Sequence, residues 1–241
     1  MKALVLAAGR GKRLQENSAH QNKCLVNIKG QPLIECSFEN ALAAEVKEIV
    51  VVVGYRAEDI INRYGNSYKG KPVKYAIQNE QAGLVHAIAC SQRVLGGSDF
   101  MLMLGDELML NPRHKEFMAK FQKENLFGLC GVVKVKDKSL IKKTYALAQD
   151  KNGVISRLIE KPDHPKNNIM GTGNCIFKHK VFDYIEKTPI NQIRGEKELP
   201  DLIQAAIDDG HLVKSFSICD EYINVNVPEE IDRANSYFRH Y

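Results

Sequence analysis

A basic, glycine-containing loop near the start of the chain holds the first residues that could bind a ligand or take part in catalysis. Residues 3–7 form a short apolar run, typical of a strand buried on both faces, and the loop 8–13 follows directly. Gly9 and Gly11 let the backbone take positive φ and approach a ligand closely. Exposed backbone N–H groups favour an anion, and so do the surrounding cations Arg10, Lys12, Arg13 and Lys23. We therefore expect a polyphosphate ligand, a nucleoside triphosphate.

The glycine pair alone is a weak signal, because any strand-to-helix turn can carry Gly-x-Gly. Two well-known nucleotide motifs fail on spacing. The dinucleotide fingerprint needs a third small residue where Leu14 and its neighbours stand, and the Gly-Lys-Ser/Thr ending of the P-loop is absent. Other features of the chain must therefore define the ligand.

A second candidate site follows the apolar run 100–104. Gly105 opens a turn that places Asp106 at the carboxyl end of a buried strand, the edge where α/β sheets bind ligands. One or two carboxylates, with phosphate oxygens and water, are the ligands that Mg²⁺ prefers. Asp106 is therefore predicted to bind Mg²⁺, and capping of the next element is the alternative. The role of the adjacent Glu107 stays open.

Residues 6–14 match in full the signature Leu-Ala-x-Gly-x-Gly-x-Arg-Leu. With it the chain resembles the sugar-1-phosphate nucleotidyltransferases, or nucleoside-diphosphate-sugar pyrophosphorylases, and especially the glucose-1-phosphate thymidylyl- and uridylyltransferases. The family's Pro-Lys-x-Leu segment corresponds to residues 22–25, where Asn22 replaces proline, a change expected to loosen the loop that carries Lys23. The resemblance implies that Arg13 steadies the leaving pyrophosphate and Lys23 the α-phosphate. The implied nucleotide-binding residues of the first loop are Leu6, Ala7, Ala8, Gly9, Arg10, Gly11 and Lys12.

The segment 78–88 leads from an expected strand into an expected helix, and it could be no more than a connecting loop. It also resembles the family's base-reading segment, in which a strand-end glutamine and a glycine five residues later bind a pyrimidine. Gln78 and Gly83 have that spacing. An amide supplies one donor and one acceptor, as the N3–H and O4 edge of uracil or thymine requires. UTP or dTTP is therefore favoured, and CTP is possible.

The second half of the chain carries the residues that the resemblance assigns to the acceptor. The runs 144–148 and 155–159 predict a hairpin with an Asn-Gly turn at 152–153, and Glu-Lys-Pro follows it. In the family, this glutamate binds sugar hydroxyls and the lysine binds the substrate's phosphate. A glycine-rich loop at 171–174 is expected to lead into a strand, and Arg-Gly-Glu-x-Glu-x-x-Asp matches at 194–201, where a charged loop with Asp201 as a helix cap is the alternative. The implied acceptor-binding residues are Tyr145, Glu160, Lys161, Asn174 and Arg194.

The segment before the last expected helix bears a second metal-binding aspartate in most members of that family. This chain has Asn224 and Asn226 there. An asparagine carbonyl can coordinate Mg²⁺ but brings no charge, so the site would depend on Asp106 and on the nucleotide's phosphates. The predicted metal ligands are therefore Asp106, Asn224 and Asn226, and the predicted cofactor is Mg²⁺.

These residues require a scaffold of alternating strands and helices. Apolar runs predict buried strands at 3–7, 48–54, 73–77, 100–104 and 126–135, and helical spacing predicts helices at 33–44, 57–64, 202–209 and 231–237. The alternation indicates an α/β fold with a doubly wound, mostly parallel sheet. The resemblance implies a mixed Rossmann-like sheet of the GT-A-like nucleotidyltransferase type with a small β-rich sugar-binding lobe. We expect a single domain, 1–241, with a nucleotide-binding half at about 1–110 and an acceptor-binding half at about 111–241.

Composition argues against several other classes. Charged residues at 26% and hydrophobic residues at 44% are ordinary for a soluble globular protein, and no apolar run is long enough to span a membrane. A net charge of +5 suits small polyanions better than nucleic acid. The six cysteines lie far apart without a Cys-x-x-Cys pair, which favours reduced thiols over a zinc site or disulfides. We expect a cytoplasmic protein with no membrane or nucleic-acid partner, in which an oligomer is possible.

The predicted reaction transfers a nucleoside monophosphate (NMP) from the triphosphate to a sugar 1-phosphate or a related phosphoryl acceptor and releases pyrophosphate. Such in-line attack needs positioning and charge neutralisation rather than a protein base. The alternatives are a cytidylyltransferase acting on a non-sugar phospho- or phosphonate acceptor, and a non-catalytic nucleotide-binding sensor. A nucleotide-sugar glycosyltransferase would need an Asp-x-Asp type pair that residues 105–107 supply poorly, and a dehydrogenase is the weakest alternative.

Overall fold

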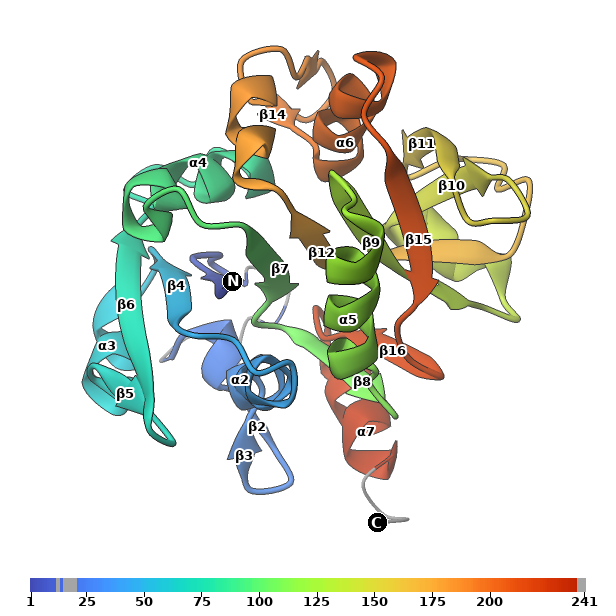
Figure 1. Cartoon of the computed structure of the whole chain (residues 1–241). Coiled ribbons are helices and arrows are strands. Elements are labelled where there is room, and N and C mark those ends of the chain that lie inside the picture. Colours follow the sequence, from blue (N-terminus) through green and yellow to red (C-terminus); the bar gives the residue numbers. More distant parts are fainter. Residues whose placement is uncertain (12–13, 15–20, 238–241) are drawn as a thin grey trace.

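The computed structural model describes residues 1–11, 14 and 21–237, and Figure 1 shows its central, largely parallel sheet. The parallel strands, in spatial order, are β7 (Phe100–Leu104), β1 (Lys2–Ala7), β4 (Ile49–Val53) and β6 (Lys71–Ile77). Val5 lies opposite Val51 on one side and Met103 on the other. Because these strands run in the same direction, their carboxyl ends meet at one edge of the sheet.

The remaining strands continue the same sheet, mostly through antiparallel pairs. β12 (Ile169–Phe177) pairs with β7 and with β9 (Gly128–Lys134), and β9 also pairs in parallel with β15 (Val213–Ser217). The hairpin of β10 (Tyr145–Gln149) and β11 (Ile155–Glu160) extends the sheet beyond β12, at the right of Figure 1. The expected fold class, a mixed and mostly parallel sheet with a β-rich second half, is therefore confirmed.

Short paired strands and 3₁₀ turns hold the loops at the edges of the sheet. The short pairs are β2 (Asn27–Ile28) with β3 (Gln31–Pro32), β8 (Glu107–Leu110) with β16 (Glu221–Asn224), β13 (Ile190–Asn191) with β14 (Glu196–Lys197), and β5 (Ser67–Tyr68) with β6. The 3₁₀ turns are η2 (Lys23–Leu25), η3 (Lys138–Lys143) and η4 (His179–Tyr184).

Helices cover both faces of the sheet because successive strand residues point to opposite faces. In β1, Ala3 and Val5 pack into a core with α2 (Ile34–Ala43), α3 (Ala57–Tyr64) and α5 (His114–Glu124). Leu4 and Leu6 pack on the opposite face with α4 (Leu84–Leu95) and α6 (Leu199–Asp208). Burying a valine or leucine side chain, such as that of Val5 or Leu4, stabilises the fold by about 1.5–3 kcal/mol. The last helix, α7 (Pro228–Tyr237), follows β16 at the lower end of the molecule in Figure 1.

One local expectation from the sequence is wrong. The glycines at 171 and 173 lie inside β12 rather than in a loop, and the ring of Tyr145 covers the first of them. The alternative role of Asp201 as a helix cap does not hold either, because Asp201 lies in the first turn of α6 and the N-cap position belongs to Glu198. In the described part of the chain, no helix is long and apolar enough to cross a lipid bilayer.

Candidate active site

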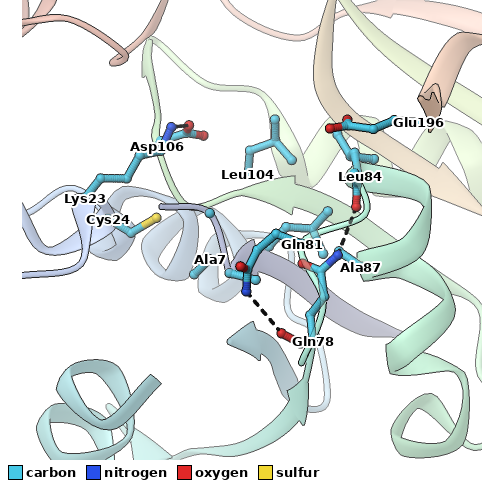
Figure 2. A pocket seen from close by; sticks show the side chains of 14 residues that line it. Ala7, Lys23, Cys24, Gln78, Gln81, Leu84, Ala87, Leu104, Asp106 and Glu196 are labelled. Atoms are coloured by element: carbon cyan, nitrogen blue, oxygen red, sulfur yellow. Dashed lines mark hydrogen bonds and ion pairs between the residues drawn. The ribbon is translucent and has the colours of Figure 1, made fainter. Parts of the chain in front are cut away.

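The loops at the carboxyl ends of β1, β6 and β7 surround two adjoining cavities. The first has a volume of about 270 Å³ and the second a volume of about 650 Å³. Residues that line both are Gly9, Lys23, Leu84, Leu104, Asp106 and Glu196. The cavities therefore meet beside the cation and the carboxylate that the sequence singles out. Figure 2 shows the side chains of Lys23 and Asp106 turned toward each other in the lining of the first cavity.

The loop after β1 lines the first cavity, and its two glycines act differently. Gly11 has a φ of +61°, which strains any residue with a side chain, and a Cβ there would lie 2.8 Å from the Cβ of Lys23. Gly9 is not among the positive-φ glycines, so that expectation is wrong for it. A Cβ on Gly9 would meet no atom of the described chain within 4 Å. The space beside Gly9 is therefore open to a ligand.

The other residues expected to bind nucleotide differ in their placement. Leu6, Ala7, Ala8, Gln78 and Gly83 all line the first cavity. Arg10 is exposed, and its Nε donates to Oε1 of the cavity residue Gln81 at 3.2 Å, so it lies near the rim. Lys12 and Arg13 fall outside the described residues.

Asn22 fixes the loop that carries Lys23, so the expected loosening is wrong. Its amide Nδ2 donates to the carbonyl of Ala7 at 3.0 Å and to that of Tyr55 at 2.8 Å, and its Oδ1 accepts from the backbone of Cys24 at 2.9 Å. Asn22 is fully buried, and its φ of −64° is one that a proline also adopts. The asparagine therefore keeps a proline-like backbone and adds bonds to the ends of β1 and β4.

Lys23 lies between two oxygen-bearing side chains from distant parts of the chain. Its Nζ forms an ion pair with Oδ2 of Asp106 and donates to Oδ1 of Asn226 at 3.1 Å. The Nδ2 of Asn226 donates to Oδ1 of Asn224 at 2.6 Å, which turns the Oδ1 of Asn226 toward the cation. Asn224 was predicted to bind the metal, but in this structure its Oδ1 accepts from Asn226 and orients that side chain.

This oxygen set fits a divalent cation by its chemistry. Asp106 offers a carboxylate and Asn226 an amide oxygen, both already turned toward a positive charge, and hard cations such as Mg²⁺ prefer oxygen ligands. Among the described residues, no group of three or more His, Cys, Asp or Glu side chains could hold a metal ion. A cation here would therefore take the rest of its ligands from a bound phosphate and water.

On the acceptor side of the second cavity, acidic and basic side chains form one cluster. Nη1 of Arg194 lies 3.2 Å from Oε1 of Glu160 and 3.0 Å from Oε1 of Glu198, and Nζ of Lys161 lies 3.3 Å from Glu160. Burial raises the pKa of Glu160 to about 7, and the nearby charge of Glu198 adds to this rise. Lys161 has a left-handed backbone with a φ of 41°, a conformation that non-glycine residues adopt mainly at constrained sites.

The motif at 194–201 supplies two glutamates to the cavities in addition to Arg194, the residue assigned from the sequence. Glu198 lines the second cavity, and burial raises its pKa. Glu196 lines both cavities, and Oε2 of Glu196 would lie 2.8 Å from a Cβ added at Gly83. Both glutamates stand at fixed positions of the matched motif, so their place in the site could have been predicted from the sequence. Lys142 and Lys143 also line the second cavity, but they lie in a run of lysines that gave no motif.

Tyr145 and Asn174, both expected at the acceptor, differ in their placement. Tyr145 lines the second cavity, and its hydroxyl donates to the carbonyl of Thr172 at 3.1 Å. Asn174 is not among the described residues that line either cavity. Its Nδ2 donates to Oε2 of Glu107 at 2.5 Å, and its Oδ1 lies 2.8 Å from Nε2 of His114. The amide of Asn174 is thus used within the protein rather than turned toward an acceptor.

Glu107, whose role the sequence left open, is a buried hub beside Asp106. Its carboxylate oxygens accept from the backbone N–H of Gly173 at 2.9 Å, from Asn174 and from the hydroxyl of Tyr222. Burial raises the pKa of Glu107 to about 8. The donors come from β12 and β16, so Glu107 joins the main sheet to the strand pair that carries Asn224.

Two joined cavities lie at the carboxyl edge of the parallel sheet, and Lys23 and Asp106 stand where they meet. This arrangement is typical of a protein that brings two polar ligands together. The family comparison agrees with this class. The model of the nucleotidyl transferase family matches residues 2–222, and the chain belongs to that family. The resemblance found in the sequence is thereby confirmed.

Individual relatives cover nearly all of the chain. It is similar to the UTP–glucose-1-phosphate uridylyltransferase of Haloferax volcanii, with 33% identity over 97% of this chain and 95% of the relative. It is also similar to the glucose-1-phosphate thymidylyltransferase of Streptomyces griseus, with 31% identity over 90% of this chain and 60% of that longer relative. A solved structure of UDP-glucose pyrophosphorylase with UDP-glucose has the same fold, with a TM-score of 0.89, 20% identity and coverage of 100% and 99% of the two chains.

Proposed function

We propose that this protein transfers an NMP group from UTP or dTTP to a sugar 1-phosphate and releases pyrophosphate. The observation that carries the proposal is the meeting of two cavities at Lys23 and Asp106. A nucleotide in the first cavity and a phosphorylated acceptor in the second would bring their phosphates together at this point. The named activities of the Haloferax and Streptomyces relatives support the same reaction.

The residues at the junction supply positioning and charge. The acceptor's phosphate oxygen attacks the α-phosphorus, a new P–O bond forms, and the bond to pyrophosphate breaks with both electrons leaving on the pyrophosphate oxygen. Lys23 holds the α-phosphate, and Arg13 is assigned to the leaving pyrophosphate by the sequence motif alone. Such a reaction needs electrostatic stabilisation and alignment rather than a protein nucleophile.

Asp106 and Asn226 would hold Mg²⁺, which neutralises the charge that collects on the phosphates when it is bound. Lys23 contacts both of these oxygens in the structure. A metal ion bound to them would displace its ammonium group, which would then be able to contact the phosphates of the nucleotide. We assign Lys161 and Arg194 to the incoming phosphate. Glu160 and Tyr145 line the same cavity, and we assign them to the hydroxyl-bearing part of the acceptor.

The test is pyrophosphate release with Mg²⁺, in which UTP, dTTP, CTP, ATP and GTP are crossed with sugar 1-phosphates and with small phospho- and phosphonate compounds. We expect release with UTP or dTTP and a sugar 1-phosphate only. Release with CTP and a non-sugar acceptor would replace the proposal by a cytidylyltransferase. Tight nucleotide binding without release for any acceptor would replace it by a sensor.

A further inference from the structure

A segment of three residues, 225–227, joins β16 to α7 and carries Asn226 at its centre. The backbone N–H of Val225 donates to the carbonyl of Asp106 at 2.9 Å. The N–H groups of the next two residues both donate to Oε2 of Glu230, at 2.7 Å and 3.2 Å. Each N–H group of the segment therefore has an acceptor, and one carboxylate serves two of them.

Glu230 is the third residue of α7, a position from which a glutamate commonly caps the start of its own helix. Such a cap bonds the N–H of the residue just before the helix, here Val227. In this chain the shorter of the two bonds reaches one residue further, to Asn226 outside the helix. Only 20% of the Glu230 side chain is exposed, and hydrogen bonds to a carboxylate are stronger than those between neutral groups. Glu230 therefore fixes the segment as well as the helix.

The side chain of Asn226 is held independently of its backbone. Its Oδ1 accepts from Nζ of Lys23 at 3.1 Å, and its Nδ2 donates to Oδ1 of Asn224 at 2.6 Å. The contact with Asn224 sets the direction in which the amide oxygen points. The contact of Glu230 with the backbone sets the place from which it points. Two different residues thus determine where this oxygen lies at the junction of the cavities.

We propose that Glu230 is a positioning residue that acts through Asn226 and keeps its Oδ1 in place for the divalent cation. This inference rests on the proposed function, in which Asp106 and Asn226 hold Mg²⁺. An amide oxygen brings no charge, so it attracts a cation less than a carboxylate does. Without Glu230, the segment would lose conformational entropy when the cation binds, and this loss would weaken the binding.

The experiment compares the wild type with Glu230→Ala and Glu230→Gln. The dissociation constant of UTP is measured by calorimetry without an acceptor, once with Mg²⁺ and once with EDTA, and the ratio of the two gives the gain in affinity due to Mg²⁺. Loss of a group that orients a metal ligand lowers metal affinity by about 10- to 100-fold. We expect this gain to fall about tenfold in Glu230→Ala. It should be largely kept in Glu230→Gln, whose amide oxygen can accept the same N–H groups.

Glu229→Ala is the matched control. Glu229 lies in the same first turn of α7 and is exposed. The control removes the same negative charge near the start of the helix but leaves the bonds to the segment intact. The gain in UTP affinity due to Mg²⁺ should equal that of the wild type.

Thermal unfolding of the same proteins separates positioning from capping. A pure helix cap would lower the Tm of Glu230→Ala and leave its gain from Mg²⁺ unchanged, and that result would overturn the inference. So would an equal loss of the gain in Glu229→Ala, or a wild type whose UTP affinity does not depend on Mg²⁺. The proposed function can fail separately: if no acceptor gives pyrophosphate while the gain still depends on Glu230, then the transferase assignment falls and the role of Glu230 stands.

Discussion

At Lys23, one ammonium group contacts two oxygens whose residues lie 83 and 203 positions further along the chain. The Oδ2 of Asp106 and the Oδ1 of Asn226 face it, and both side chains are mostly buried. Charges in such a water-poor site interact more strongly than on the surface. This arrangement is the reason for placing the α-phosphate and the divalent cation at the same point.

Replacing Lys23 by alanine removes one preorganised positive group from the transition state. We expect Lys23→Ala to lower the rate by about 10² to 10³, which corresponds to about 3–4 kcal/mol. The measurement is kcat with UTP and a sugar 1-phosphate, and Lys47→Ala, at an exposed lysine, serves as the control. If Lys23→Ala kept more than about half of the activity, its assigned role would be wrong.

The proposed contact of Glu160 with the acceptor predicts that the KM for the acceptor depends on pH. Its pKa is raised to about 7 by burial, so the carboxyl is protonated below that pH and ionised above it. Only the ionised form is a pure acceptor for sugar hydroxyls. The KM for the acceptor should therefore rise by up to about tenfold per unit as the pH falls below 7. Glu160→Gln should abolish this dependence, whereas a KM that is constant from pH 8 to pH 6 in the wild type would refute it.

The key charged residues of the site could be predicted because they stand at fixed spacing after apolar runs. Lys23 was assigned by the family motif and Asp106 by the apolar run before it, and the structure brings the two together. The roles of Asn22 and Asn174 could not be predicted in this way. Whether an amide bonds the protein or a ligand depends on which carbonyls and carboxylates the fold brings beside it, and these come from distant segments.

At the scale of elements, the segment of η2 is held by Asn22 rather than by proline rigidity. Asn22→Ala should remove the bonds to the carbonyls of Ala7 and Tyr55 and destabilise the protein by about 1–3 kcal/mol. Asn22→Pro loses these bonds and also the bond from the backbone N–H to Oδ2 of Asp59 at 3.1 Å, but a φ of −64° suits proline and limits the motion of Lys23. We expect kcat to decrease in the order wild type, Asn22→Pro, Asn22→Ala.

Urea unfolding and steady-state kinetics on the three proteins test this order. An Asn22→Ala protein with unchanged stability would show that the hydrogen bonds contribute nothing. An Asn22→Pro protein slower than Asn22→Ala would show that the backbone bond to Asp59 contributes more than the rigidity of proline.

Strands and helices whose apolar residues repeat at one clear spacing could be predicted from the sequence. Elements in which apolar and charged residues are mixed could not. Strands β1, β4 and β7 are continuous apolar runs, and the hairpin β10–β11 has its Asn-Gly turn where expected. Helix α5 buries Phe117 and Phe121 among many charged residues, so its apolar stripe is narrow. Strand β15 is short and polar in part, and it depends on pairing with β9, which no local pattern reveals.

At the scale of the whole molecule, Glu107 joins two sheets that carry different parts of the site. Glu107→Ala would leave the buried donors of Gly173, Asn174 and Tyr222 without their acceptor. We expect a loss of about 3 kcal/mol and a fall in Tm of about 6–12 °C. Glu107→Gln keeps one acceptor oxygen for Gly173 and Tyr222, so it should have a smaller effect. A Tm of Glu107→Ala within 1 °C of the wild-type value would show that the hydrogen bonds to Glu107 do not stabilise the fold.

The two cavities follow from the topology of the whole chain. The nucleotide-side residues come from β1, β6 and β7, whereas the acceptor-side residues come from the hairpin β10–β11 and from the segment before α6. Strand β12 connects these halves, because it pairs with β7 on one side and with β10 on the other. The division into halves near residue 110 stays a prediction, since the sheet runs through both.

The decisive measurement follows the α-phosphate of the nucleotide. UTP labelled in its α-phosphate is incubated with the protein, Mg²⁺ and a sugar 1-phosphate, and the products are separated by anion-exchange chromatography. We expect the label to appear in a nucleotide sugar, with one pyrophosphate released for each molecule formed, and we expect Asp106→Asn to form this product much more slowly. Label that stays in UTP, or that appears as UMP whether or not the sugar 1-phosphate is present, would contradict the proposed transfer.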